Sequence, residues 1–243
     1  MIFSPTSLIC GIVAARFVPI RSGLAYVANN GRPYAGAAFL SASFSSPARQ
    51  PWPTTGKNWY TTAMKIIVGL GNPGDKYKNN RHNVGFLAVN FLDGQLGTGD
   101  GQWEDKFQSG IREIASWDEK VILMKPRTFM NDSGKAVAEI VNFYKLNPAA
   151  DIIVLHDEVD LPFGTIRATK SSSSAGQNGV QSIIDELGTQ NFHRIRIGVE
   201  TRESRAQMDT RDFVLQNFSP DELKKLQAET FPKVKEEIEK FLV

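Results

Sequence analysis

From residue 64 onward, short apolar runs alternate with segments of helical periodicity, and this alternation constrains the fold more than any other feature. Four runs have the length and the β-branched composition of buried strands. They are Lys65–Leu70, Val121–Met124, Ile152–Leu155 and Ile195–Val199. Strands separated by helices predict a single α/β domain, with a mixed, mostly parallel twisted sheet flanked by helices.

The segments between these runs place apolar residues on one helical face. Helices are expected over Val84–Leu92, from Ser133 onward, and over Val180–Leu187, where a glycine follows the last residue. Ser219–Glu222 has the pattern of a helix start, with a capping Ser, a Pro at the first position and a Glu that completes a capping box. Pro232 predicts a break in the C-terminal helix.

Residues 1–63 differ in composition from the rest of the chain. They contain no Asp or Glu and five of the 28 Lys and Arg residues, so residues 64–243 carry three more acidic than basic side chains. The segment is rich in Ser, Ala, Gly and Pro and has no sustained apolar periodicity. A segment of this kind buries too little apolar surface to offset chain entropy. We therefore expect a disordered extension over 1–63 and one folded domain over 64–243.

Two interpretations of residues 1–63 stay open. Met64 directly precedes the first predicted strand, so it is a candidate for the true start. An acid-free, Ser-rich segment that contains arginines is also typical of organelle transit peptides. A secretory signal fits less well, because no basic residue precedes the apolar stretch Leu8–Ala15. The expected location is the cytoplasm, with a mitochondrion or plastid as the alternative if the segment is a genuine transit peptide.

Composition also restricts the kind of site. Cys10 is the single cysteine, which excludes an internal disulfide and any site with several cysteine ligands. Three histidines argue against a histidine-rich metal site, and we expect no metal. No apolar run approaches 18 residues, so no membrane span is expected.

Gly69–Gly74 matches the pattern G-x-G-x-x-G after a predicted strand, and Asp93 follows about 20 residues later, as in dinucleotide-binding proteins. That fingerprint requires a helix that opens within the glycine loop and directs backbone N–H groups at the pyrophosphate. Here the glycines are followed by the polar stretch Asp75–Arg81, which has no helical apolar periodicity. The sequence therefore argues against a nucleotide site.

Polar residues at the ends of predicted elements suggest a different chemistry. Histidine is the side chain that acts as a base near neutral pH without a perturbed pKa, and His82 is the candidate. Asp157 follows a buried strand after one residue and is placed to fix the tautomer of a histidine. Asparagines offer uncharged donors to a carbonyl oxygen. The pattern Gly-x-Ser-x-Gly is absent, so we expect a histidine to activate water rather than a serine nucleophile.

Ordered motifs extend over nearly the whole predicted domain. They are Val68–Gly74 with Tyr77 and Arg81–Gly85, Lys125–Val137, His156–Gly164, Gly176–Gly179, Phe192–Gly198, and Asp212–Leu215 with Phe218. Together, over residues 64–243, they resemble the bacterial-type peptidyl-tRNA hydrolases. The order and spacing of the motifs make chance agreement negligible.

The resemblance implies roles residue by residue. His82 would activate water against the ester that joins a nascent peptide to the 3′-terminal ribose of tRNA, and Asp157 would orient His82. Asn72 would line the catalytic cleft. The substrate-binding residues would be Tyr77, Met130, Asn131 and Asn178. Members of this family need no cofactor, are mostly monomeric, and recover tRNA from peptidyl-tRNA released by stalled ribosomes.

For the tRNA itself we expect weak contacts from Arg167, Lys170 and Arg196. Arg81 and Lys106 would complete a basic patch, although Arg81 also suits a structural role in its loop. The excess of acidic residues in 64–243 does not exclude RNA binding, because affinity depends on a local patch rather than on net charge.

The chain departs from the family pattern before the last asparagine. Ser171–Ser174 stands where the family usually has glycines, Gln177 where it has a histidine, and Thr169 at a basic position near the tRNA 5′-phosphate. A non-catalytic RNA-binding descendant of the same fold, of the organelle splicing-factor type, is therefore the alternative function. An unrelated small-molecule hydrolase comes third. His156 and His193 are expected to be structural.

Overall fold

A computed structural model describes residues 17–20, 23–26, 64–96, 102–116 and 119–242. The chain divides into two compact units, Met1–Gly56 and Lys57–Val243. In the first unit, β1 (Phe17–Ile20) pairs antiparallel with β2 (Gly23–Tyr26). The rest of the predicted extension over 1–63 lies outside the described residues.

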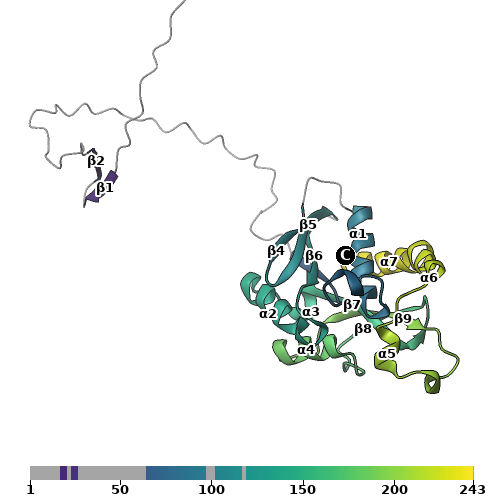
Figure 1. Cartoon of the computed structure of the whole chain (residues 1–243). Helices are drawn as coiled ribbons and strands as arrows, with labels where there is room; N and C mark the ends of the chain where they lie inside the picture. Colours follow the sequence, from purple (N-terminus) through teal and green to yellow (C-terminus); the bar gives the residue numbers. More distant parts are fainter. Residues whose placement is uncertain (1–16, 21–22, 27–63, 97–101, 117–118, 243) are drawn as a thin grey trace, which may run out of the picture. The chain divides into compact units, whose positions relative to one another are not determined.

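The described part of the second unit contains a seven-stranded mixed sheet (Figure 1). Four parallel strands form its centre, and antiparallel strands complete both edges. In spatial order they are β4 (Glu104–Lys106), β5 (Ser109–Ser116), β6 (Glu119–Pro126), β3 (Met64–Gly69), β7 (Ile152–Pro162), β9 (His193–Glu200) and β8 (Ile166–Lys170). The predicted α/β fold is confirmed.

Helices cover both faces of this sheet because successive residues of the central strands point in opposite directions. Ile67 belongs to a core shared with α1 (Val84–Leu96) and α7 (Phe231–Leu242). Ile66 and Val68 belong to a second core, shared with α2 (Ser133–Tyr144) and α4 (Asn178–Leu187). None of the helices in the described ranges combines the length and the apolar character needed to cross a membrane.

Shorter helices connect these layers. The α-helical pieces are α3 (Pro148–Asp151), α5 (Thr210–Val214) and α6 (Pro220–Lys225). The 3-10 turns are η1 (Asp75–Tyr77), η2 (Arg81–Asn83), η3 (Met130–Asp132) and η4 (Arg205–Gln207), and η5 (Leu226–Thr230) is a π-helical turn.

One predicted boundary is confirmed and another is wrong. The Ser219 hydroxyl and the Glu222 side chain form the expected capping box at the start of α6. The break predicted at Pro232 does not occur: the chain stays helical from Pro220 to Leu242, with the π-helical turn η5 immediately before α7, whose first turn contains Pro232. The strands β4, β5 and β8 were not predicted from the sequence, and β7 runs seven residues beyond the predicted strand.

The glycine pattern after β3 serves close packing. A Cβ on Gly85 would lie 2.4 Å from the Leu155 carbonyl oxygen, and a Cβ on Gly69 would lie 2.4 Å from the Gly85 carbonyl oxygen. The first turn of α1 thus packs directly on the backbones of β3 and β7. The loop itself leads into a 3-10 turn, and α1 begins only at Val84. The helix N-terminus that a dinucleotide site needs does not form in this loop.

Candidate active site

His82 and Asp157 meet at the carboxyl ends of the central strands. The Nδ1 atom of His82, in η2, lies 2.9 Å from Oδ2 of Asp157, on β7. Because a carboxylate only accepts hydrogen bonds, Nδ1 carries the proton and Nε2 is left as the basic nitrogen. The His82 side chain is 14% exposed and Asp157 only 4%.

Asp157 lies inside a strand, whereas the sequence analysis placed it after one. The parallel pairing of β3 with β7 ends at Gly69 and Leu155, but β7 continues beside β9, where Asp157 pairs in register with Ile197. Asp157 therefore stands just beyond the end of β3, over the turn that carries His82. The extra pairing with β9 holds its backbone rigidly.

Gln177 holds the other oxygen of the same carboxylate. Its Nε2 atom donates to Oδ1 of Asp157 at 3.0 Å, and its Oε1 atom accepts from the Val180 backbone N–H at 2.7 Å as the N-cap of α4. The two contacts fix the orientation of the amide. A residue noted in the sequence only as a departure from the family is thus a positioning group for Asp157.

Asn72 and Asn83 close the loop that presents His82. The Asn83 side chain accepts from the Asn72 N–H at 2.8 Å and donates to the Asn72 carbonyl oxygen at 2.9 Å. The Asn72 side-chain oxygen accepts from the Met130 N–H at 2.9 Å, which ties this loop to η3. The role of Asn83 was missed in the sequence, although its position directly before a helix was a signal for such a contact.

The electrostatics favour a histidine base. Burial disfavours the charged imidazolium, but the charge and hydrogen bond of Asp157 outweigh burial, and the pKa of His82 is raised above its ordinary value. Burial acts to raise the pKa of Asp157, but His82 and the hydrogen bond from Gln177 hold it below its ordinary value. A lowered pKa favours the ionised form of Asp157, whose negative charge would stabilise an imidazolium at His82.

His82, Asp157, Gln177 and Asn178 line one pocket of about 390 Å³. Another wall is formed by Arg205, Thr210, Arg211 and Val214, from the segment 205–214. Such a cleft, with a buried His–Asp pair at its base, has the features of a hydrolytic active site.

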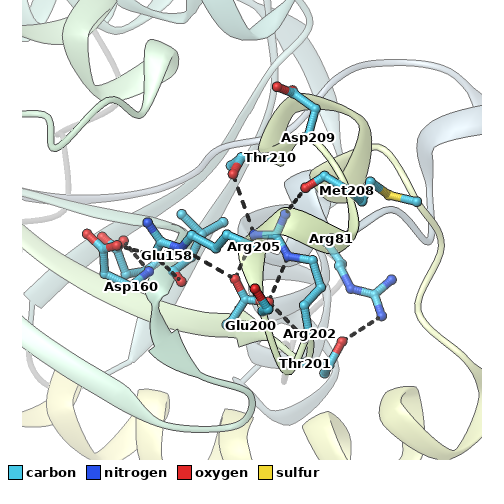
Figure 2. Close-up of polar contacts among 12 residues, drawn as sticks. Arg81, Glu158, Asp160, Glu200, Thr201, Arg202, Arg205, Met208, Asp209 and Thr210 are labelled. Carbon is cyan, nitrogen blue, oxygen red and sulfur yellow. Dashed lines mark hydrogen bonds and ion pairs between the residues drawn. The ribbon is translucent and has the colours of Figure 1, made fainter.

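An ionic network holds this wall against β7, as Figure 2 shows. Arg202 donates to both Glu200 oxygens, at 3.0 and 2.7 Å, and to the Met208 carbonyl oxygen. Arg205 donates to the Asp160 carboxylate and to the Val159 carbonyl oxygen. The wall is thus attached to the strand that carries Asp157.

The sequence profile of the family described as Peptidyl-tRNA hydrolase matches residues 66–243. The chain belongs to this family. It is 47% identical over 163 residues to a peptidyl-tRNA hydrolase of Fusobacterium nucleatum, covering 67% of this chain and 82% of the relative. It is 45% identical over 172 residues to that of Herpetosiphon aurantiacus, covering 70% and 79%.

A solved structure supports the same assignment. The crystal structure of peptidyl-tRNA hydrolase from Acinetobacter baumannii matches with a TM-score of 0.63 and 30% identity, covering 75% of this chain and 94% of that one. The family resemblance inferred from the motifs is confirmed.

The substrate-binding residues expected from the family occupy different places. Met130 is buried, with its sulfur 3.3 Å from Gln177 Nε2, and Asn178 is exposed at the start of α4 in the catalytic pocket. Asn131 is exposed in η3, next to Met130. Tyr77 is half-buried in η1, with the Lys76 ammonium over its ring. Their contacts with substrate stay predictions.

The five expected cations do not form one patch. Arg167 and Lys170 are exposed on β8, and Arg196 on β9 pairs with Glu158. Lys106 lies on β4, at the opposite edge of the sheet. Arg81 is buried and pairs with Glu222 at 2.8 Å, so its role is structural.

The loop Ser171–Ser174, called the serine loop below, is held in place by a buried arginine. Arg194 donates to the carbonyl oxygens of Ser172, Ser173 and Gln190, and its side chain stacks on Phe192. Burial lowers the pKa of Arg194 to about 10. These contacts fix a loop that includes Ser171 at a φ of 54°, a backbone conformation that favours glycine.

The remaining histidines lie outside this chemistry. His156 is buried, its Nδ1 atom donates to the Asp157 carbonyl oxygen, and burial lowers its pKa. His193 stacks on Phe241 at the start of β9. Across the described ranges, no three His, Cys, Asp or Glu side chains are grouped to hold a metal ion.

Proposed function

We propose that this chain hydrolyses the ester bond between a peptide and the 3′-terminal ribose of tRNA. Family membership supports the reaction, and the His82–Asp157–Gln177 hydrogen-bond chain supports the assignment of His82 as the base. A protein that only binds RNA has no need of a buried carboxylate that orients a histidine, so the RNA-binding alternative is less favoured.

In the first step, a water molecule attacks the ester carbonyl carbon while Nε2 of His82 takes its proton. The imidazolium that forms is stabilised by the ionised carboxylate of Asp157. The carbonyl oxygen becomes an oxyanion, to which the Asn178 side-chain amide donates from the edge of the pocket.

In the second step, the tetrahedral intermediate collapses and the ribose oxygen leaves. His82 returns its proton to this oxygen, so that the 3′-terminal hydroxyl of tRNA is restored and the peptide leaves as a carboxylic acid. Neither step requires a cofactor.

The substrate would lie across the sheet. Arg167, Lys170 and Arg196 occupy β8 and β9, on one side of Asp157, and would contact the tRNA backbone there. Asn72, Met130 and Asn131 lie on the other side, above β3 and β6, and would contact the peptide. We also propose that the protein works as a monomer in the cytoplasm, as its family resemblance implies.

The test is hydrolysis of an N-acetyl-aminoacyl-tRNA by the full chain, measured as release of free tRNA. His82→Ala removes the base and should lower kcat by about 10²–10⁴. His193→Ala is the matched control, because this histidine lies at the start of β9, away from the site, and should keep full activity.

Retention of activity in His82→Ala would exclude His82 as the base. Absence of hydrolysis by the unaltered chain, with tRNA still bound, would support the RNA-binding alternative instead.

A further inference from the structure

A second pocket adjoins the catalytic one on the far side of the Asn72–Asn83 pair. Its volume is about 380 Å³, and it is lined by the loop that follows β3, the end of β6, Gly110 of β5, the first turns of α1, and Trp103. Asn83 and Pro73 belong to its wall, so the loop that presents His82 separates the two pockets. The mechanism proposed above makes no use of this space.

The charged residues that line this pocket are all basic. Lys78, Lys125 and Arg127 contribute to its lining, and none of the described residues that line it is a carboxylate. Arg127 is partly neutralised by Asp105, at 2.7 Å, outside the pocket. The two lysines have no carboxylate within contact distance among the described residues.

Lys125 is the central group. Its ammonium lies 3.7 Å from the centre of the Trp103 ring and donates to Oδ1 of Asn90 at 2.7 Å. Burial lowers the pKa of Lys125 below its ordinary value, and repulsion by Arg127 adds to this effect. The attraction of Asp93 opposes both but does not outweigh them. The remaining N–H donors of this half-buried ammonium would form charge-assisted hydrogen bonds with an anion that entered the pocket.

The position of the pocket in the sheet indicates which part of the substrate reaches it. Gly110 of β5 and Lys125 and Pro126 of β6 line it. The cations expected to contact tRNA belong to β9 and β8, which follow β7 toward the other edge of the sheet (Figure 1 shows the strands). In the placement proposed above, with the ester at His82, the tRNA extends over β9 and β8 and the peptide over β3 and β6. The pocket lies on the proposed peptide side.

We propose that this pocket is a specificity subsite that binds an acidic side chain of the peptide, and that Lys125 and Lys78 pair with the carboxylate of that side chain. The aromatic walls, Phe86 and Trp103, accept the methylene groups of an Asp or Glu side chain, and the ammonium groups pair with its carboxylate. This inference rests on the proposed peptidyl-tRNA substrate and adds a preference within it.

The test compares pairs of N-acetyl-peptidyl-tRNAs with the same tRNA and the same C-terminal residue. Each pair differs by Glu or Gln at the second, third or fourth residue from the ester. The full chain should show a kcat/KM about three- to tenfold higher for the Glu member at one of these positions. Lys125→Met should reduce this Glu/Gln ratio to near one, and Lys125→Arg should keep it, because it restores the charge.

Lys78→Gln provides a second variant at an exposed position that does not threaten folding, and it should lower the ratio in part. Lys233→Gln, on the surface of α7, is the matched control and should leave the ratio unchanged. A ratio near one at all three positions in the unaltered chain would overturn the proposal. So would an equal loss for both members in Lys125→Met, which would indicate a contact with the tRNA. Absence of hydrolysis of every substrate would instead refute the proposed function.

Discussion

Replacing Asp157 by Asn tests the hydrogen-bond chain, because Gln177 dictates how the new amide must turn. The Oε1 atom of Gln177 accepts from Val180 N–H, so its Nε2 atom must donate toward residue 157. An Asn at this position satisfies that donor with its carbonyl oxygen and presents its NH₂ group to His82. Nδ1 of His82 must then accept, and the proton moves to Nε2, where the base is needed.

The structure also gives the magnitude. To restore the productive tautomer, the Asn amide must turn its NH₂ group toward the Gln177 NH₂ group, which loses a buried hydrogen bond worth about 2–3 kcal/mol. That difference leaves about one molecule in 30 to 150 in the productive form. Loss of the negative charge beside the imidazolium adds to it, so Asp157→Asn should lower kcat by about 10²–10⁴.

The decisive measurement is a double variant in single-turnover hydrolysis of N-acetyl-aminoacyl-tRNA. Adding Gln177→Leu to Asp157→Asn frees the Asn amide to turn, so the double variant should be about tenfold faster than Asp157→Asn alone. Gln177→Leu alone should lose less than about tenfold, because a carboxylate accepts from His82 in either orientation. Circular dichroism would check that all three variants fold. A double variant as slow as Asp157→Asn would refute the reasoning.

Three further outcomes follow from the structure. The acidic limb of the kcat/KM pH profile should report a His82 pKa above its ordinary value, because neutral His82 is the active form and Asp157 raises that pKa. In Asp157→Asn the carboxylate no longer opposes the effect of burial, so the acidic limb should move to lower pH. An unchanged pH profile would contradict the pairing of His82 with Asp157. Gly85→Ala should lower the free energy of unfolding by about 1–3 kcal/mol, because its Cβ meets backbone atoms, whereas Gly94→Ala, in the same helix with open space around it, should be neutral or stabilising in urea unfolding. Arg194→Met should cost about 1–3 kcal/mol by leaving buried carbonyl groups without a donor, and thermal unfolding should show Arg194→Lys in between; equal melting temperatures would show that the serine loop does not depend on this arginine.

The central elements were predictable because their signals are local. β3 has a β-branched run that is buried on both faces, and α1 has an apolar face with the helical period. The strands β5 and β8 carry exposed polar residues and lie at or near the edges of the sheet, where pairing with a neighbour, rather than composition, makes a strand.

For the candidate site, the sequence predicted which residues take part but not how they contact one another. His82 and Asp157 were identified from motifs, but the position of Asp157 inside β7 depends on pairing with β9, which lies about 40 residues later in the chain. The contact of Gln177 with Asp157 also joins distant segments, and glutamine is not a preferred N-cap residue, so no local propensity reveals it. Contacts of this kind follow from topology and become visible only in three dimensions.

The amide at Gln177 has a consequence for how steeply the enzyme loses activity in acid. Among the described residues, the Asp157 carboxylate accepts from one titrating side chain, His82, since Gln177 does not titrate and His156 contacts only the backbone. Inactivation therefore requires a single proton, and log kcat/KM should fall with unit slope as the pH decreases. An imidazole in place of the amide would add a second titrating group to the same carboxylate. With Gln177 at this position, the proposed catalytic centre should be inactivated by the uptake of one proton, at His82.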